Sequence, residues 1–481
     1  MSKNEPSMDR SFSVRGEWWV DGQEQDKLVG KLRFKPKHGF TLKLNGIFAS
    51  EPVWPNSDGL ENDRRIIGET FDNSVCLIES AWVRKLAPAH VASGSVSEYG
   101  ALSIRIGGSI VFDEGPVLYS SANLRLSGLT RWINRGLPST DRSDHQYPSL
   151  PHIEFGAPAI GARLVIWAAI TQKIGLQKEG YEFEERIQII PEHPQSEKWY
   201  QDIAYRLNCL MVVLCGEPSE IDGLSLYPGE EDQTELIRGG PLARRTVVHS
   251  VYMTVRSKVK PSLGRLGTDH SYREMDGYVE NVVAGWLAFG ELEQRCSGIL
   301  TGSLMERDSP IDFKLVALVT AVEQIAAGLG ASRAMDVSAF ELIRNRLVEQ
   351  LPKCLHVDLD RLFSDRFRNI NGKTLRASID SLLDMQDSLS VEKVTFGNRD
   401  FAADVTKTRN AITHPRTGKD LERARDIRKM VLLVDSLECL LKHHLLLRAG
   451  MQESALGEHY QTNYRLREYF GLRIRQFRGE A

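Results

Sequence analysis

The side chains best suited to chemistry in this 481-residue sequence are an arginine and a histidine separated by four residues. They are Arg409 and His414, in the segment Arg409-Asn410-Ala411-Ile412-Thr413-His414. A histidine, with an ordinary pKa of about 6.5, can take or give a proton near neutral pH. An arginine stays charged, and its planar guanidinium matches the oxygens of a phosphate.

These two residue types suit the cleavage of RNA by its own 2′-OH. When that hydroxyl attacks the neighbouring phosphorus, the reaction needs a base for the hydroxyl proton, an acid for the departing 5′-oxygen and positive charge at the phosphorus. No metal is required, and no Cys/His cluster of the sequence has the spacing of a zinc site. We therefore expect no cofactor.

The spacing alone selects nothing, because an arginine followed by a histidine after four to six intervening residues occurs six times. The six pairs are Arg33/His38, Arg84/His90, Arg186/His193, Arg244/His249, Arg265/His270 and Arg409/His414. Five of them precede residue 271, mostly in segments predicted to be strands or loops. Only the last pair lies in a helical region, and only there does an asparagine follow the arginine.

The local context of this pair predicts where its side chains lie. Asn410 and His414 are four residues apart, so they share a helical face and the amide can orient the imidazole. Pro415 disfavours helical geometry in the residue before it. His414 is therefore expected at a helix end, where a substrate can reach it.

The elements that must position this pair follow from the hydrophobic rhythm. Up to about residue 275 the chain alternates polar and apolar residues in strand-like runs, with one expected helix from about Ser196 to Cys215, capped by Ser196. Beyond that point apolar residues recur every three or four positions, as in helices that bury one face against each other in a bundle. The fold class is therefore α+β. The three expected helical stripes are Leu315/Leu318/Val322/Ile325/Leu329, Phe340/Ile343/Leu347/Leu351 and Ile427/Val431/Val434/Leu437/Leu441/Leu445.

The composition is that of an ordinary globular protein, with 41% hydrophobic and 26% charged residues. The segment 1–11 is polar and lacks the apolar stretch of a signal peptide, and no apolar run is long enough to span a membrane. We expect a cytoplasmic protein with reduced cysteines. The net charge of −3 is unevenly distributed along the chain. Residues 1–300 carry 33 basic and 39 acidic groups, a balance of −6, and residues 301–481 carry 28 basic and 25 acidic groups, a balance of +3.

The C-terminal region, roughly 305–450, resembles the HEPN domain of the ApeA-type bacterial antiphage-defence proteins. The resemblance rests on Arg409-Asn410-Ala411-Ile412-Thr413-His414-Pro415 and on Ala321-Val322-Glu323-Gln324 in the first bundle helix. The N-terminal half adds segments that resemble the opening of the ApeA N-terminal domain. These are Val14-Arg15-Gly16-Glu17-Trp18-Trp19, Gly30-Lys31-Leu32-Arg33-Phe34 and Leu42-Lys43-Leu44-Asn45-Gly46.

This resemblance implies an abortive-infection ribonuclease that works as a homo-oligomer, at least a dimer through the HEPN domain, in which two Arg/His motifs face each other. Arg409 and His414 would be catalytic, Asn410 would position His414, and Glu323 would either orient the arginine or be an exposed helical glutamate. The implied partners are RNA, with tRNA as one candidate, and an unidentified phage-derived trigger. No membrane is expected.

The domain organisation follows from the same resemblance. We expect a β-rich ApeA-like sensing or regulatory domain over 1–300, a HEPN helical nuclease domain over 301–450, and a basic and aromatic tail over 451–481. The tail can stack on bases or dock on the bundle or on a partner subunit, and we favour docking.

Further cations and histidines surround the motif in the sequence. Residues 407–429 hold eight basic and three acidic residues, and this balance of +5 can hold an RNA backbone or belong to a solvated helix face. Lys407, Arg416 and Lys419 are the candidate RNA-binding residues. His443 and His444 have no third metal ligand nearby and are interpreted as surface or interface residues.

Two other readings stay open. In one, a β-rich recognition domain is joined to a catalytically silent HEPN dimerisation module. In the other, the protein recognises carbohydrate, and only the tryptophans of the first strand support this interpretation. Trp18 and Trp19 are neighbours on a strand, so their side chains face opposite sides, and we expect at least one to be buried.

Overall fold

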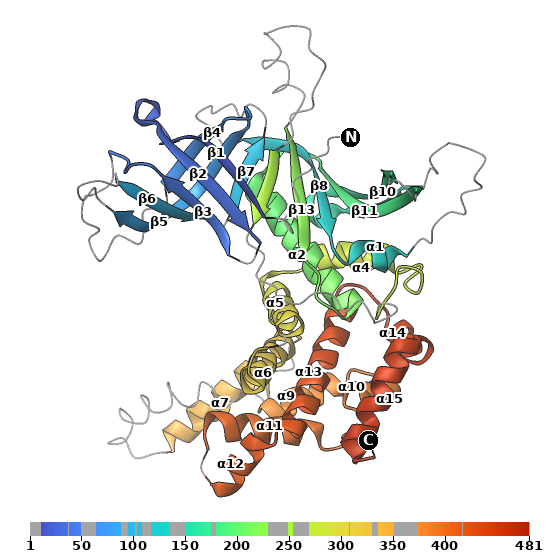
Figure 1. Ribbon diagram of the computed structural model, residues 1–481. Helices are drawn as coiled ribbons and strands as arrows, with labels where there is room; N and C mark the ends of the chain where they lie inside the picture. The colour runs from blue at the N-terminus through green and yellow to red at the C-terminus, as the bar shows by residue number, and fades with distance from the viewer. Residues whose placement is uncertain are drawn as a thin grey trace, which may run out of the picture. The chain divides into compact units, whose positions relative to one another are not determined.

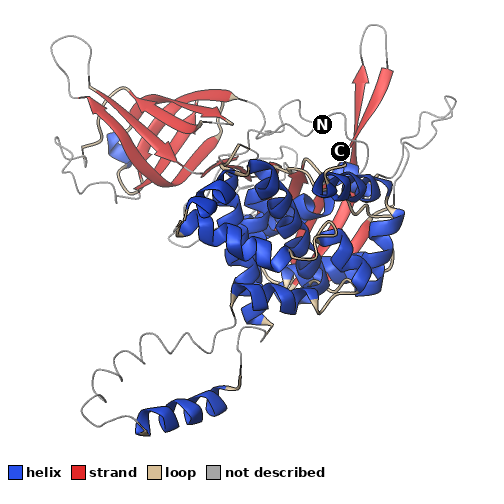
Figure 2. Cartoon of the chain, turned by 90° about the horizontal axis from the view of Figure 1, so that it is seen from below, coloured by secondary structure: helices blue, strands red, loops and turns tan. Residues whose placement is uncertain are grey.

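The structure is a computed structural model of the whole chain. It describes residues 11–36, 38–49, 64–87, 95–101, 103–107, 117–134, 151–174, 179–228, 249–253, 269–306, 308–329, 335–350, 374–415 and 417–480. The chain divides into two compact units, which are residues 1–266 with 271–273, and residues 267–270 with 274–481. Figure 2 distinguishes them by secondary structure, since the first is built mainly of strands and the second of helices.

Six antiparallel strands of the first unit close into a barrel, in the order β1-β2-β3-β6-β5-β4 with β4 returning to β1 (Figure 1). Every second side chain of these strands points inward, and the interior is filled by residues such as Trp18, Leu32 and Phe34, all 0% exposed. Gly68 gives Trp18 its room, since a Cβ there would collide with the indole ring. The strands are β1 (Phe12–Val20), β2 (Leu28–Lys35), β3 (Gly39–Leu44), β4 (Arg64–Thr70), β5 (Val75–Ala87) and β6 (Val96–Ala101).

A second run of antiparallel strands continues from the barrel, because β7 pairs with β5 on one side and with β14 on the other. The order from there is β7-β14-β13-β8-β11-β10-β9, with the short β12 paired to β8. The strands are β7 (Ser103–Gly107), β8 (Leu118–Leu126), β9 (Ile153–Ala157), β10 (Ala162–Ile174), β11 (Glu179–Pro191), β12 (Gln195–Ser196), β13 (Ile221–Pro228) and β14 (His249–Met253).

One long helix, α2 (Glu197–Cys215), packs on β8 and β13. It begins where the sequence predicts, because the Ser196 hydroxyl accepts a hydrogen bond from the Trp199 backbone N–H at 3.4 Å. The described part of this unit also has short helical segments, η1 (Glu24–Asp26), α1 (Leu129–Ile133) and η3 (Pro158–Ile160). Trp18 and Trp19 are both buried, which confirms that the pair does not form an open aromatic platform.

The second unit is helical, and its core is made by α6 packing on α5, α9, α11 and α13. Two of the three predicted stripes are largely buried, with Leu315 and Leu318 on α6 and Leu437 on α13 each 0% exposed, but Ile427 at the start of α13 is 63% exposed. The helices are α4 (Val279–Leu287), α5 (Glu291–Met305), α6 (Ile311–Gly328), α7 (Val337–Glu349), α9 (Leu375–Leu383), α10 (Ser388–Val394), α11 (Phe401–Thr413), α12 (Gly418–Arg425), α13 (Ile427–Arg448), α14 (Glu453–Thr462) and α15 (Tyr464–Arg478). The α+β fold class is confirmed.

The predicted stripe Phe340/Ile343/Leu347/Leu351 lies on a helix, but this helix does not bury it. On α7, Ile343 is 45% and Leu347 is 48% exposed, while Leu351 lies outside the described residues. The expectation that this stripe packs inside the bundle is therefore wrong. Amphipathic periodicity specifies that a helix has an apolar face, but it does not specify which element covers that face.

The expected tail is two helices that dock on the bundle. Phe470 of α15 is 2% exposed, and its ring lies 5.2 Å from that of Tyr460 on α14 and 6.3 Å from that of Phe396. Arg473 forms an ion pair with Asp435 of α13. Much of the aromatic surface of this segment is thus occupied by packing. Among the described helices, none is long and apolar enough to cross a membrane.

Candidate active site

The predicted motif lies at the C-terminal end of α11. This helix forms because Phe401, Ala402, Val405 and Thr408 place buried side chains along one face, and α11 packs with it against α6 and α9. The helix ends at Thr413 and His414 is its C-cap, which confirms the boundary predicted from Pro415. The side chain of His414 is exposed, as the prediction required.

The opposite face of α11 carries the chemistry. Lys407, Asn410 and His414 follow one another at intervals of three and four residues, and all three are exposed. Arg409 is half-buried beside them. The structure therefore brings the cation, the amide and the imidazole together at one exposed helix end.

The hydrogen bonds at this helix end differ from the expected arrangement. The Arg409 guanidinium donates from Nη1 to the Asn410 side-chain oxygen at 3.2 Å, and the Asn410 carbonyl accepts the His414 backbone N–H at 2.8 Å. Thr413 donates its hydroxyl to the Arg409 carbonyl at 2.9 Å. In the described part of the chain the His414 ring has no hydrogen-bond partner. The role of Asn410 in orienting that ring stays a prediction, and in this geometry the amide contacts the arginine instead.

Glu323 lies on α6, which packs against α11, and its side chain is half-buried. Within the described residues the structure records no hydrogen bond or ion pair between Glu323 and Arg409. Its neighbour Gln324 faces α5, where its side-chain oxygen lies 3.7 Å from the Cys296 sulfur. The orienting role of Glu323 stays a prediction.

The charges of the region favour an anionic ligand, because residues 407–429 hold eight basic and three acidic residues. Asp404 on α11 is paired with Lys429 on α13 at 2.9 Å. Asp420 forms a capping box with Thr417 at the start of α12, and Asp426 caps α13. These contacts hold α11, α12 and α13, and the region stays basic because its cations outnumber its carboxylates.

The candidate RNA-binding lysines lie among these exposed cations. Lys407 is exposed on α11 and Lys419 on the first turn of α12. Among the described residues, Lys407, Lys419 and Arg409 have no ion-pair partner. Arg416 lies outside the described residues. A sequence signal for α12 existed, since Thr417 and Asp420 have the spacing of a capping box.

His443 and His444 are not surface residues, so that interpretation is wrong. They are 0% and 2% exposed. The His443 ring contacts the Tyr460 hydroxyl at 3.0 Å and a Glu453 carboxylate oxygen at 2.8 Å, and the His444 Nε2 lies 3.2 Å from the Leu382 carbonyl. Burial lowers the pKa of His444 to about 4, so its ring is neutral at pH 7. Two adjacent histidines in a sequence do not reveal that neighbouring helices will cover both.

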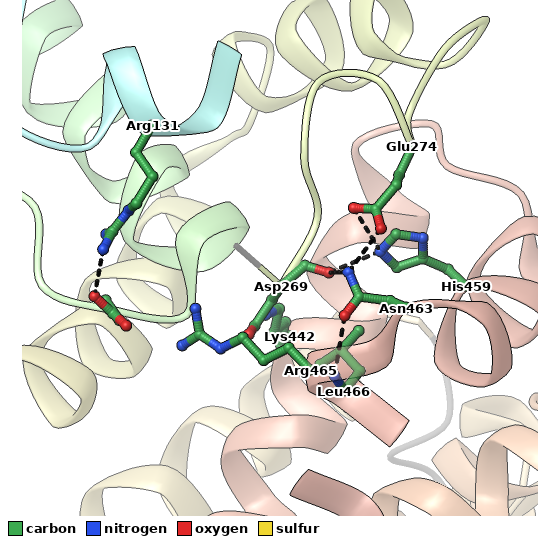
Figure 3. A network of polar contacts seen from close by, with 9 residues as sticks. Arg131, Asp269, Glu274, Lys442, His459, Asn463, Arg465 and Leu466 are labelled. Atoms are coloured by element: carbon green, nitrogen blue, oxygen red, sulfur yellow. Dashed lines mark hydrogen bonds and ion pairs between the residues drawn. The ribbon is translucent and has the colours of Figure 1, made fainter. Parts of the chain in front are cut away.

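A second polar network holds the start of the helical unit against its last helices (Figure 3). One carboxylate oxygen of Asp269 accepts from Lys442 of α13 at 2.6 Å, and the other lies 3.2 Å from Arg465 of α15. The Asp269 carbonyl accepts from Asn463 at 3.2 Å and lies 2.7 Å from the His459 ring. Asp269 therefore joins three helices that no sequence pattern brings together.

Comparison with known protein families finds two matches. Residues 13–157 match the description ApeA N-terminal domain 1, and residues 316–455 match Apea-like HEPN. The first match covers the barrel and strands β7, β8 and β9. The second covers most of α6 and continues through α13, including α11 with its motif. Comparisons with curated proteins and with solved structures found no significant match. The chain therefore combines an ApeA N-terminal domain 1 with an Apea-like HEPN domain.

Proposed function

We propose that this protein is a metal-independent endoribonuclease of abortive-infection antiphage defence, in which Arg409 and His414 cleave RNA. The observation that carries the proposal is the position of both residues at an exposed end of α11, inside a HEPN domain. Nearby Lys407 and Lys419 have no ion-pair partner among the described residues. The antiphage role rests on the two ApeA-related domains together.

The proposed reaction is a transfer at phosphorus. An imidazole takes the proton of the 2′-OH, the 2′-oxygen forms a bond to phosphorus, and the bond from phosphorus to the 5′-oxygen breaks. The departing 5′-oxygen takes up a proton, so the products are a 2′,3′-cyclic phosphate and a 5′-OH. The Arg409 guanidinium stabilises the negative charge that develops on the phosphoryl oxygens.

The chemistry also supports a dimer. The base and the acid act on opposite sides of the phosphorus, and one α11 end carries a single histidine. Arginine cannot serve as the second proton carrier, because its pKa lies far above neutral. We propose that the HEPN domains of two copies face each other, so that one His414 accepts the proton and the other donates one. A structured RNA such as tRNA is the proposed substrate, and the β-rich unit is the proposed sensor of infection.

The experiment compares wild type, His414→Ala and His193→Ala on total bacterial RNA in EDTA, with RNA from phage-infected cells as a second readout. His193 is a matched control because it is exposed and also follows an arginine at the required interval, yet lies in the other unit. We expect cleavage with cyclic phosphate ends from wild type and His193→Ala only. Equal cleavage by His414→Ala would reject the site. Silence of all three in infected cells would favour a recognition protein with a silent HEPN module.

A further inference from the structure

The outer face of the barrel carries cations in direct register across neighbouring strands. Arg15 on β1 lies opposite Lys31 on β2, and Lys31 lies opposite Lys43 on β3. Each projects to the side away from the buried interior, because its neighbours along the strand point inward. Adjacent strands are about 4.8 Å apart, so three positive charges follow one another across the sheet at that interval.

This row is unfavourable for the fold itself. Like charges directly opposite each other on a sheet are destabilising. Within the described residues none of Arg15, Lys31 and Lys43 has an ion-pair partner. The face adds Arg33, which lies opposite Thr41, and Lys85 on β5. Its acidic residues include Glu17 on β1 and Glu98 on β6, and Glu98 lies between Lys43 and Lys85. A face that served only solubility would gain stability from mixed charges.

An aromatic residue and a cation are built into the same face. The pairing of β5 with β6 shifts between Val83 and Lys85, so a bulge re-aims the intervening Arg84. Its guanidinium carbon lies 5.7 Å from the centre of the Trp82 ring, and its Nη1 donates to the Thr41 hydroxyl at 3.2 Å. Both side chains lie over Gly100 of β6, where a Cβ would collide with Arg84. Trp82 stays partly exposed.

From these observations we propose that the outer face of β1, β2, β3, β6 and β5 binds a single-stranded nucleic acid. The row Arg15-Lys31-Lys43, with Arg33, neutralises successive phosphates, and the Trp82–Arg84 pair offers a flat surface on which a base stacks. A single strand fits because its bases are free to stack, whereas those of a duplex are covered. This inference does not depend on the nuclease activity of the helical unit.

The test measures binding of labelled 20-nucleotide RNA, DNA of the same sequence and duplex DNA to the full chain carrying His414→Ala, by fluorescence anisotropy over a range of salt. Arg33→Gln/Lys43→Gln is compared with Arg163→Gln/Lys198→Gln. The control removes the same charges from exposed positions of the same unit outside the barrel. Trp82→Ala is compared with Trp82→Phe, which keeps a ring.

We expect Arg33→Gln/Lys43→Gln to weaken single-strand binding about tenfold and to lower the salt slope by about 1.4, that is, by about 0.7 for each lost contact. Trp82→Ala should weaken it about fivefold and Trp82→Phe much less. The Arg33→Gln/Lys43→Gln protein should melt close to the parent, because both side chains are exposed and Lys43 lies between a like charge, Lys31, and an opposite charge, Glu98. Which of RNA and DNA binds more tightly identifies the strand.

Three outcomes would overturn the inference. Unchanged affinity of Arg33→Gln/Lys43→Gln, or equal losses in the control pair, would assign binding to general charge or to the HEPN surface. Displacement of the nucleic acid by polyglutamate at the same charge concentration, with no effect of Trp82→Ala, would instead indicate a surface for an acidic protein. The binding assay does not depend on the proposed nuclease activity, because the parent protein already carries His414→Ala. Failure of the proposed function would therefore leave this test intact.

Discussion

Two regions of the helical unit use histidine in opposite ways. At the end of α11, His414 is exposed, and its ring has no hydrogen-bond partner in the described chain. On α13, His444 is covered by α9 and its neighbours, and its ring contacts the Leu382 carbonyl and the Gln386 side chain. Burial holds the pKa of His444 near 4, whereas an exposed imidazole is free to exchange protons with a substrate. The same residue type therefore serves packing in one place and suits chemistry in the other.

The largest expected effect is on the rate of RNA cleavage. His414→Ala should lower kcat/KM by about 10²- to 10⁴-fold, the range for removal of a general acid or base. Because the side chain is exposed, the melting temperature should stay within a degree or so of wild type. Initial rates and thermal melts of the same preparations measure both. A large fall in melting temperature would show that His414 also supports the fold and would weaken the contrast with His444.

His444→Ala should have the reverse signature. The substitution leaves a cavity and deprives the buried Leu382 carbonyl of its partner, so we expect a loss of about 3 kcal/mol in the free energy of unfolding. Urea unfolding measures it, and cleavage rates are compared well below the melting temperature. If the folded His444→Ala variant loses cleavage as completely as His414→Ala, the assignment of His444 to packing and of His414 to chemistry is wrong.

Acid should destabilise the folded state through His444. Its pKa is about 4 when folded and about 6.5 when unfolded, so between these values the unfolded chain binds a proton that the folded chain does not. Stability from this group is therefore lost as the pH falls from 6.5 to 4, by about 3 kcal/mol. Burial raises the pKa of Glu438 to about 7, which acts in the opposite direction over pH 4.5 to 7.

The effect of His444 is isolated by comparing wild type with His444→Gln, since Glu438 is common to both. Urea midpoints at pH 7, 6, 5 and 4.5 should fall less steeply for the variant than for wild type. Parallel curves would mean that His444 titrates in the folded state as it does in the unfolded state.

The smallest expected effect concerns the exposed cations. Lys407→Gln should lower kcat/KM by about fivefold at low salt and by less at high salt, because the charge acts through a screened contact with phosphate. The matched control is Lys198→Gln, an exposed lysine of the other unit. An effect that does not change with salt would point to a packing role for Lys407 and not to RNA binding.

The sequence patterns predicted local structure well and long-range contacts poorly. Alternation predicted that the first part of the chain is built of strands, Ser196 predicted the start of α2, and Pro415 predicted the end of α11. Each of these depends on residues close together in the chain. Barrel closure depends on β4 pairing with both β1 and β5, and the burial of His444 depends on a distant helix, so neither had a local signal.

The apolar stripe of α7 and the Arg409–Asn410 hydrogen bond show the same limit within the candidate site's own domain. The stripe predicted the helix but not its exposure, because exposure depends on what packs against it. The spacing of Asn410 and His414 correctly predicted a shared face. The side-chain oxygen of Asn410, however, accepts a hydrogen bond from the neighbouring Arg409. Spacing specifies which side chains can meet, and the competing donors determine which of them do.

The network around Asp269 has a consequence for the order in which the protein is made. Asp269 is translated before α11, whereas its four partners in the network are translated after α11. They are Lys442, His459, Asn463 and Arg465. The start of the helical unit therefore cannot be anchored until α14 and α15 have been synthesised. During translation the Arg409–His414 segment emerges into a unit that is still incomplete. A protein whose proposed activity destroys RNA would in this way finish its fold only after the messenger has been read past the motif.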